Sequence, residues 1–228
     1  MPSSIRSLVA TLLLAASALS AQAPRSIPQE PPNLGQQKTR LIAYHDCAQP
    51  TCYTPTIERQ SDLAIAFLRR RTAHARPGEK LALVLDIDET SLSNWDIATK
   101  DDFGYIVKDW DDLALKADTP AIPGTLRVYR EAILHHVDVY FITGRPESQR
   151  DATAANLKSA GYTAWSGLTL RGPHPRGELT EVFKSAARRK IAEDHRIILN
   201  IGDQLSDLAL APQAEYSVKL PNPFYFIP

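Results

Sequence analysis

An apolar run that ends in two acids is the feature of this sequence that most limits its fold. Residues 81–85 read LALVL, and Asp86-Ile87-Asp88 follow directly. A run that is apolar at every position is typical of a strand buried on both faces, as in a parallel α/β sheet. Ligand sites in such sheets lie beyond the carboxyl ends of the strands. Because side chains at i and i+2 of an extended segment point the same way, we expect Asp86 and Asp88 to share one site.

Two carboxylates in one site constrain its chemistry. They repel each other unless a proton or a cation lies between them. The pair therefore predicts a divalent cation with acid chemistry around it. The alternative is a turn at the end of the strand, in which the acids cap backbone groups.

Strand-like and helix-like segments alternate along most of the chain. Besides residues 81–86, the candidate strands cover residues 137–142, 168–170, 197–201 and 216–220. The candidate helices cover residues 56–72, 123–136, 147–160 and 178–194. This alternation predicts an α/β fold, namely a three-layer, Rossmann-like fold with a mostly parallel sheet. Residues 92–120 are rich in aromatic residues and Asp and contain no strand-like run, so we expect a small cap insertion after the first strand.

The N-terminus resembles an export signal. Arg6 precedes an apolar stretch over residues 8–19, which is shorter than the roughly 20 residues that span a membrane. Residues 1–23 are predicted to be a signal peptide, with cleavage after Ala23 or Ser20; the alternatives are an N-terminal anchor or a frayed helix. No Cys ends the apolar stretch, which argues against a bacterial lipoprotein anchor. We therefore expect a periplasmic or secreted protein without a stable membrane anchor.

The remaining chain is predicted to form one domain. Residues 24–40 are rich in Pro and Gln and are interpreted as a flexible leader, and residues 41–228 are long enough to bury one core. The chain carries 26 basic and 26 acidic residues. This balance argues against general binding to nucleic acid or a membrane surface and favours small-molecule chemistry.

Two cysteines, Cys47 and Cys52, lie close together in CAQPTC. In an exported protein this spacing favours a disulfide at the entry to the first long helix. Two free thiols are an alternative. A metal site that also uses His45 is a further one, but it lacks a fourth ligand at ordinary spacing.

Three further motifs fall where an α/β fold would place a site. Thr143 and Gly144 end the second strand in FITGRP, Lys184 lies on a helix, and Asp203 and Asp207 follow a later strand in GDQLSD. Each alone has a structural explanation: a strand residue, a solvated charge, a turn with a helix cap. Together, and in this order, they predict a catalytic site.

These motifs resemble those of the haloacid-dehalogenase-like (HAD-like) phosphatase superfamily. The strings DIDETSLSN, FITGRP, FKSAARRKI, NIGDQLSD and KLPNPFYFIP are similar to its acid phosphatase branch, which includes bacterial class C acid phosphatases and plant vegetative storage proteins. The resemblance covers about residues 41–228. One departure is Leu205, where plant relatives often carry Trp; it concerns packing beside the metal loop and not the ligands.

The resemblance implies a mechanism and a cofactor. Mg²⁺ would be held by Asp86, by Asp203 and by the backbone carbonyl of Asp88, with Asp207 helping directly or through a water. Asp86 would attack the phosphorus to give an aspartyl-phosphate, and Asp88 would act as general acid and then as general base. For this role we expect Asp88 to have a raised pKa, which an apolar cap would favour.

The resemblance also implies how the phosphoryl group is bound and what it belongs to. Thr143, Gly144 and Lys184 would bind the phosphoryl group. The substrates would be small phosphomonoesters, with nucleoside monophosphates as one candidate, at a pH optimum that the family suggests is acidic.

Some residues keep two interpretations. Thr90 either organises the loop by hydrogen bonding or caps the next helix. Arg145 either contacts the substrate or forms a structural ion pair. Trp95, Tyr105 and Trp110 either stack on an aromatic leaving group or fill the core of the cap.

Two functions compete with the hydrolase. One is a storage or phosphate-binding protein with little turnover, which the retained Asp86 argues against. The other is a phosphotransferase that passes the phosphoryl group to an alcohol, which shares the same first half-reaction. The sequence also leaves a homo-oligomer open.

Overall fold

The computed structural model describes residues 30–175 and 177–227, and the folded unit begins at Leu34. The predicted signal peptide, residues 1–23, and the first part of the predicted leader lie outside the described residues. Within the described ranges, no helix has the length and apolar character that crossing a bilayer requires.

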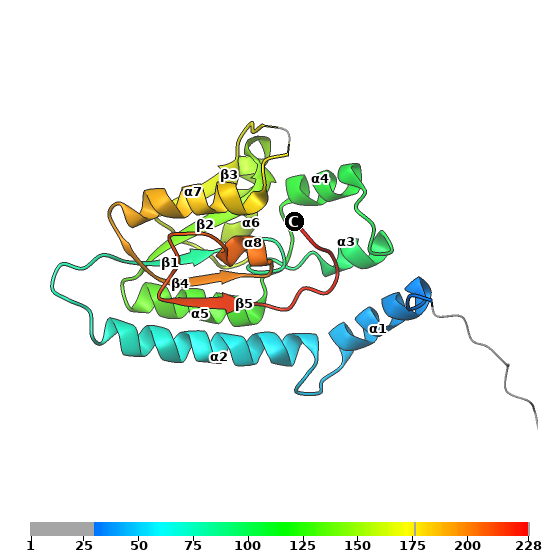
Figure 1. The fold of residues 1–228 in the computed structure, drawn as a ribbon, viewed down its shortest axis with the longest axis horizontal. Helices are drawn as coiled ribbons and strands as arrows, with labels where there is room; N and C mark the ends of the chain where they lie inside the picture. The colour runs from blue at the N-terminus through cyan, green and yellow to red at the C-terminus, as the bar shows by residue number, and fades with distance from the viewer. Residues whose placement is uncertain (1–29, 176, 228) are drawn as a thin grey trace, which may run out of the picture. The chain divides into compact units, whose positions relative to one another are not determined.

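The core of the fold is a five-stranded sheet in which all paired strands are parallel, in the order β3-β2-β1-β4-β5 (Figure 1). The strands are β1 (Leu81–Leu85), β2 (Asp138–Pro146), β3 (Gly167–Arg171), β4 (Arg196–Gly202) and β5 (Tyr216–Lys219). Every residue of β1 is buried, as its apolar run predicts. The predicted α/β fold with a parallel sheet is confirmed.

Helices cover both faces of this sheet (Figure 1). The helices of the described residues are α1 (Leu34–Asp46), α2 (Tyr53–Thr72), α3 (Trp95–Lys100), α4 (Val107–Lys116), α5 (Pro123–Leu134), α6 (Arg150–Ser159), α7 (Thr180–Ala192) and α8 (Leu205–Leu208), with a 3₁₀ turn η1 (Glu147–Gln149) before α6. Of these, α1, α3 and α4 lie beyond the end of the sheet and not on its faces. Alternate side chains of β1 pack on opposite faces of the sheet. Leu83 and Leu85 belong to the large apolar cluster with α2 and α5, whereas Ala82 and Val84 pack with α7.

The register of the sheet determines which loops meet. Leu85, the last residue of β1, pairs with Phe141 of β2 on one side and with Ile201 of β4 on the other. The residues that follow these three positions therefore leave the sheet at the same edge. This edge carries the predicted acids and the Thr-Gly turn, as expected for a parallel sheet.

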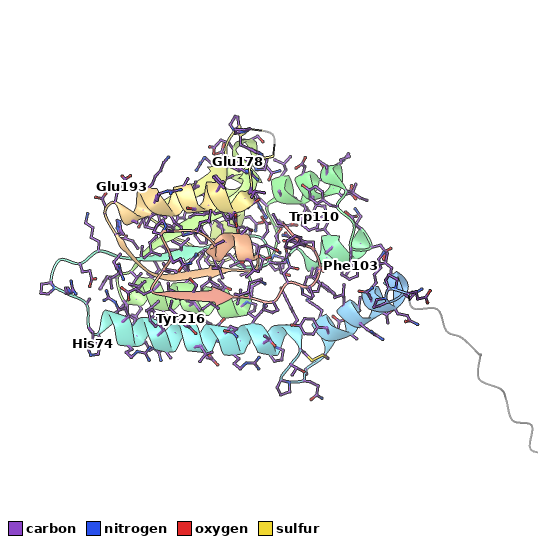
Figure 2. All side chains as sticks on the ribbon, in the orientation of Figure 1. His74, Phe103, Trp110, Glu178, Glu193 and Tyr216 are labelled. Atoms are coloured by element: carbon purple, nitrogen blue, oxygen red, sulfur yellow. A yellow bond between two sulfur atoms is a disulfide. The ribbon has the colours of Figure 1, made fainter. Side chains whose placement is uncertain are left out.

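The segment after β1 contains α3 and α4 and no named strand. It lies within residues 92–120, which the sequence predicts to be an insertion. Figure 2 shows Phe103 and Trp110 of this segment at the opposite end of the folded unit from His74, which follows the C-terminal end of α2.

Helix α1 corrects the predicted leader. Residues 34–40, assigned to a flexible segment, form the first turns of this helix. No residue of α1 is fully buried, and only Leu41 and Tyr44 pack, partly buried, against the large apolar cluster. Two contacts with distant residues add to its support: Lys38 forms an ion pair with Asp102 at 2.5 Å, and the ring of His45 stacks on Trp95 with centroids 3.6 Å apart.

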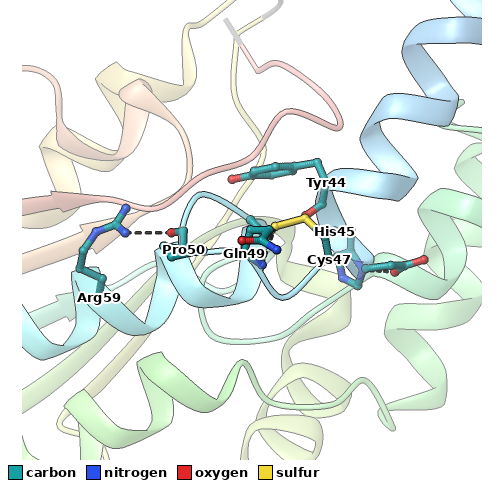
Figure 3. Close-up of a disulfide and its surroundings, with 8 residues drawn as sticks. Tyr44, His45, Cys47, Gln49, Pro50 and Arg59 are labelled. Atoms are coloured by element: carbon teal, nitrogen blue, oxygen red, sulfur yellow. Dashed lines mark hydrogen bonds and ion pairs between the residues drawn. A yellow bond between two sulfur atoms is a disulfide. The ribbon is translucent and has the colours of Figure 1, made fainter.

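The predicted disulfide joins Cys47 to Cys52 at the turn between α1 and α2 (Figure 3). The Cys52 backbone amide donates to the carbonyl of Gln49 at 2.8 Å, and Arg59 donates to the carbonyl of Pro50 at 2.9 Å. The turn is therefore fixed both by the covalent bond and by hydrogen bonds. Helix α2 begins directly after it, at Tyr53, earlier than the predicted start at residue 56.

Candidate active site

Three buried carboxylates meet beyond the ends of β1 and β4. One carboxylate oxygen from each of Asp86, Asp203 and Asp207 lies within 4.8 Å of the other two. The Nζ of Lys184 lies 2.5 Å from Asp86 Oδ1 and also contacts the carboxylate of Asp207. The structure thus brings together residues that the sequence predicts as nucleophile, phosphate ligand and metal ligands.

The charges of this cluster do not balance. Burial and the neighbouring carboxylates raise the pKa of Asp86, although Lys184 opposes this. Burial, with Asp207 and Glu89 nearby, raises the pKa of Asp203 to about 7. One ammonium faces three carboxylates, and hard oxygen donors at this spacing are the ligands that Mg²⁺ prefers. The donor set therefore fits a divalent cation.

Hydrogen bonds orient Asp203 from three sides. Thr90 Oγ1 donates to Asp203 Oδ1 at 3.0 Å, while the amides of Gln204 and Asn222 donate to Oδ2 at 2.8 and 2.7 Å. Of the two interpretations of Thr90, the structure supports the one in which it organises the loop. Helix α3 has Asn94 at its N-cap position instead.

Hydrogen bonds hold both the side chain and the backbone carbonyl of Asp207. The backbone amide of Gln204 donates to Asp207 Oδ2 at 2.8 Å in a capping box of the short helix α8. A Cβ at Gly202 would overlap the side chain of Asp207, so a glycine is needed there. The carbonyl of Asp207 accepts from Arg188 at 2.6 Å and from Asn200 at 3.0 Å.

Arg188 and Asn200 are site residues that the sequence analysis missed. Arg188 lies four residues after Lys184 in a basic run that is typical of a solvated helix end. Its only signal is this helical spacing, which places it on the same face as Lys184.

Asp88 lies in an ion pair with Arg145. The Arg145 guanidinium contacts the carboxylate through Nη2 at 2.7 Å and through Nε at 3.1 Å, and Asn94 Nδ2 donates at 2.8 Å. Burial by itself raises the pKa of Asp88, but Arg145 and Asn94 outweigh it and the pKa is lowered. The predicted raised pKa of Asp88 is therefore wrong for this structure, because the Arg145 guanidinium stabilises the charged carboxylate more than burial destabilises it. Of the two interpretations of Arg145, the structure shows the ion pair.

The turn after β2 completes the site. Thr143 is fully buried; its hydroxyl accepts the backbone amide of Arg145 at 3.1 Å and donates to Asp88 Oδ2 at 3.4 Å. Apart from Gly144 and its two chain neighbours, no atom of the described residues lies within 4 Å of the place where a Cβ at Gly144 would be, so a ligand can approach this backbone closely.

A cavity of about 490 Å³ opens above these residues. Asp86, Asp88 and Lys184 lie on its polar side. The apolar side comes from the α3–α4 segment and from the C-terminal tail, through Phe103, Tyr105, Trp110, Leu113, Phe224, Tyr225, Phe226 and Ile227. The contribution of the tail was missed by the sequence analysis, although NPFYFIP is rich in aromatic residues.

The aromatic residues of the insertion divide between two roles. Trp95 packs between His45 and Phe224, with ring centroids 3.6 and 4.9 Å away, as a core residue would. Tyr105 is 70% exposed and lines the cavity beside Trp110, with centroids 5.5 Å apart. These two side chains are therefore placed to contact a ligand.

The fold and site together define a class of protein: a parallel α/β protein with a carboxylate–lysine cluster, suited to a metal and an anion, at the carboxyl edge of its sheet. The family model for HAD superfamily, subfamily IIIB (acid phosphatase) matches residues 25–228. The chain belongs to this family, and the resemblance found in its motifs is confirmed.

Plant proteins are among the relatives. The chain is 36% identical over 148 residues to Acid phosphatase 1 of Solanum lycopersicum, covering 63% of this chain and 58% of that protein. It is 35% identical over 168 residues to the Stem 28 kDa glycoprotein of Glycine max, covering 71% and 65%, and 32% identical over 154 residues to Vegetative storage protein 1 of Arabidopsis thaliana, covering 64% and 55%. The chain thus spans less than two thirds of the length of each of these relatives.

Solved structures of a class C acid phosphatase from Bacillus anthracis share the fold. One superimposes with a TM-score of 0.69 at 26% sequence identity and covers 85% of this chain and 86% of that one. A second, with tungstate bound, gives the same TM-score and identity and covers 83% and 85%.

Proposed function

We propose that this protein is an exported, Mg²⁺-dependent acid phosphatase that hydrolyses small phosphomonoesters through an aspartyl-phosphate on Asp86. The observation that carries the proposal is the contact of Lys184 with Asp86 at the polar side of the cavity, 2.5 Å from nitrogen to oxygen. A carboxylate beside a fixed cation can attack an anionic ester, because the cation offsets the charge of the ester. Family membership and the named acid phosphatase relatives support the same activity.

The metal would be held by Asp86, Asp203 and the backbone carbonyl of Asp88, with Asp207 beside them. When bound, Mg²⁺ supplies positive charge that offsets the phosphoryl oxygens and the nucleophile. The buried carboxylate oxygens of the cluster, within 4.8 Å of one another, support this assignment.

In the first half-reaction, a carboxylate oxygen of Asp86 bonds to phosphorus and the bond to the ester oxygen breaks. Asp88 in its protonated form gives a proton to the leaving alcohol. Because Arg145 lowers the pKa of this carboxyl, that form is populated only as the pH falls, which agrees with an acid phosphatase. The Thr143 hydroxyl and the backbone at Gly144 donate hydrogen bonds to the phosphoryl oxygens, and Lys184 offsets their charge. Arg145 holds the Asp88 carboxylate in place through its forked contact.

In the second half-reaction, Asp88 takes a proton from water as the water oxygen bonds to phosphorus. The bond from phosphorus to the Asp86 oxygen breaks, which restores the carboxylate and releases inorganic phosphate. The proton that Asp88 takes from water replaces the one it gave to the alcohol, so this side chain serves first as acid and then as base. One water molecule and one ester are consumed for each alcohol and phosphate formed.

The size and lining of the cavity support the substrate class. Tungstate is tetrahedral like phosphate, and its presence in the Bacillus anthracis relative supports an oxyanion site in this fold. The apolar side of the cavity, at about 490 Å³ in total, suits an aromatic leaving group, and nucleoside monophosphates are one candidate. The predicted signal peptide supports a periplasmic or secreted location.

A storage role is the second candidate, because several relatives are named as stem glycoproteins or vegetative storage proteins. The two roles differ in turnover. The test is the release of free phosphate from p-nitrophenyl phosphate and a nucleoside monophosphate panel, by the protein and by Asp86→Asn, each with Mg²⁺ and with EDTA. Release that requires both Asp86 and metal supports the enzyme, and the absence of Asp86-dependent release at any pH supports storage.

The same assay separates hydrolysis from transfer. Addition of glycerol would raise substrate consumption without a matching rise in free phosphate if an alcohol accepts the phosphoryl group. Equal consumption and release exclude the phosphotransferase.

A further inference from the structure

The C-terminal tail returns to the site after β5. In Figure 1 this red segment runs from the end of β5 toward α4. Asn222 donates to Asp203 Oδ2 at 2.7 Å. Gln204 Nε2 donates to the carbonyl of Tyr225 at 3.4 Å, and Gln204 Oε1 accepts the amide of Ile227 at 3.4 Å. The tail is thus attached to the loop that carries Asp203.

A second attachment joins the tail to the loop after β1. The hydroxyl of Tyr225 donates to the carboxylate of Glu89, the residue after Asp88. Glu89 is almost fully buried and has a positive φ of 52°, a conformation that a residue with a side chain adopts at a cost. Its carboxylate also accepts the backbone amide of Asn94 at 2.7 Å and the Asn94 side-chain amide at 3.3 Å. Burying a carboxylate costs free energy unless it is hydrogen-bonded, so the contacts of Glu89 with Tyr225 and Asn94 are needed to keep it buried.

The two attachments determine where the tail lies against the cavity. The ring of Tyr225 lines the cavity and meets Trp110 edge to face, with centroids 5.9 Å apart. Phe226 and Ile227 continue the same wall. Glu89 is not among the residues that line the cavity, and it meets the lining through Tyr225 on one side and through Asn94 on the other.

We propose that Glu89 and Tyr225 are a positioning pair that fixes the C-terminal tail as one wall of the leaving-group cavity, and so sets which phosphomonoesters the site accepts. The enzymatic part of this proposal rests on the proposed phosphatase function. Tyr225 acts on the leaving group and not on the phosphoryl group, and Glu89 acts on the leaving group through it. Their loss therefore changes the selectivity between esters more than it changes the chemistry common to all of them.

The enzymatic test compares two phosphomonoesters, the aryl ester p-nitrophenyl phosphate and the small alkyl ester glycerol 2-phosphate. Tyr225→Phe removes only the hydroxyl. We expect the ratio of kcat/KM, aryl over alkyl, to fall about fivefold or more, mainly through the KM of the aryl ester, as loss of one hydrogen bond would give. Tyr216→Phe is the matched control, because this β5 residue stacks on Phe67 with centroids 4.9 Å apart and lies outside the cavity lining.

Variants at Glu89 separate the acceptor role from a merely structural one. Glu89→Gln keeps one carbonyl that can accept from Tyr225, but its amide nitrogen then faces the backbone amide of Asn94, so we expect a ratio between those of the native protein and Tyr225→Phe. Glu89→Leu removes the acceptor and should lower the ratio as Tyr225→Phe does. If the two residues act as a pair, Tyr225→Phe has no further effect on the ratio in the Glu89→Leu background. If Glu89→Leu does not fold, Tyr225→Phe alone still tests the proposal.

Hydrogen exchange of the tail tests the positioning without any activity. Amides within residues 222–227 should exchange faster in Tyr225→Phe than in the native protein, and Tyr216→Phe should leave them unchanged. Unchanged exchange in Tyr225→Phe overturns the proposal, and so does an unchanged ratio in an active enzyme. If the native protein hydrolyses neither ester, the phosphatase function fails, while the exchange result still decides whether Glu89 and Tyr225 hold the tail.

Discussion

Lys184 contacts two carboxylates of the site at once: its Nζ lies 2.5 Å from Asp86 Oδ1 and also touches the carboxylate of Asp207. The lysine comes from α7, Asp86 follows β1, and Asp207 lies in α8. One buried ammonium therefore joins three segments that lie far apart in the sequence. Its loss should affect both activity and stability.

Replacement of Lys184 by Met is expected to lower kcat/KM by about 10² to 10³, the range for removal of one group that stabilises charge in a transition state. It should also destabilise the protein by about 3–5 kcal/mol, because buried carboxylates lose their cation. Thermal unfolding should show that MgCl₂ raises the Tm of Lys184→Met more than that of the native protein. Lys190→Met, at an exposed position of the same helix, is the control. No rise of Tm with MgCl₂ in any of the three proteins would argue against a metal among these carboxylates, and an equal rise in all three would mean that Lys184 does not compete with the metal.

The fork between Arg145 and Asp88 gives a second prediction. Arg145→Lys keeps the charge but cannot reproduce two parallel contacts, because an ammonium is a point charge. We expect kcat/KM to fall about tenfold, and further in Arg145→Gln, since the carboxylate loses its orientation. Steady-state kinetics with one phosphomonoester measure this. Arg150→Lys, which changes an exposed pair with Glu147, provides the comparison. Full activity of Arg145→Lys would mean that a positive charge alone, without the forked contact, is enough to position the Asp88 carboxylate.

Arg188 is expected to contribute to the free energy of unfolding through its hydrogen bonds to the loop after Asp207. It is 1% exposed and donates to the carbonyls of four residues, namely Asp207, Ala209, Leu210 and Pro212. Lys cannot reach all of these from one nitrogen, and each hydrogen bond from a charged group contributes about 1.5–3 kcal/mol. Urea unfolding should show Arg188→Lys to be destabilised by about 3 kcal/mol or more. The neighbouring exposed Arg189→Lys should change stability by less than about 0.5 kcal/mol; similar losses in both variants would count against the assigned contacts.

The sheet and the residues at its carboxyl edge could be predicted from the sequence. The continuous apolar run of β1 implies burial on both faces, and parallel register then brings Asp86, Thr143 and Asp203 to one edge. Lys184 could be placed because helices between parallel strands pack on the sheet. These inferences depend on period and order along the chain, which a sequence displays directly.

The remaining features depend on contacts between distant residues. Helix α1 has no fully buried residue, and its contacts through Lys38 and His45 are with residues of the α3 region. Arg188 is typical of a solvated residue until the loop after Asp207 folds over it. The lowered pKa of Asp88 follows from the position of Arg145, and no periodicity gives that distance.

An ion-pair network at the other end of the sheet should make stability depend on pH. Arg71 contacts Glu79 at 2.6 Å and Glu215 at 2.8 Å. Hydrogen bonds from Arg71 lower the pKa of Glu79 to about 2. Burial raises the pKa of Glu215, but Arg71 and Arg196 outweigh it, so this pKa is lowered as well.

A carboxylate whose pKa is lowered in the folded state stabilises the protein above its unfolded pKa, about 4.5 for Glu79. This stabilisation is lost as the pH falls from that value through about 2. We therefore expect Arg71→Met to lower the free energy of unfolding at pH 6, but to have much less effect near pH 2. Chemical denaturation at a series of pH values measures the difference, with Arg189→Met as the control. A deficit in Arg71→Met that is the same at pH 6 and at pH 2 would show that the arginine contributes through packing of its alkyl chain and not through its charge.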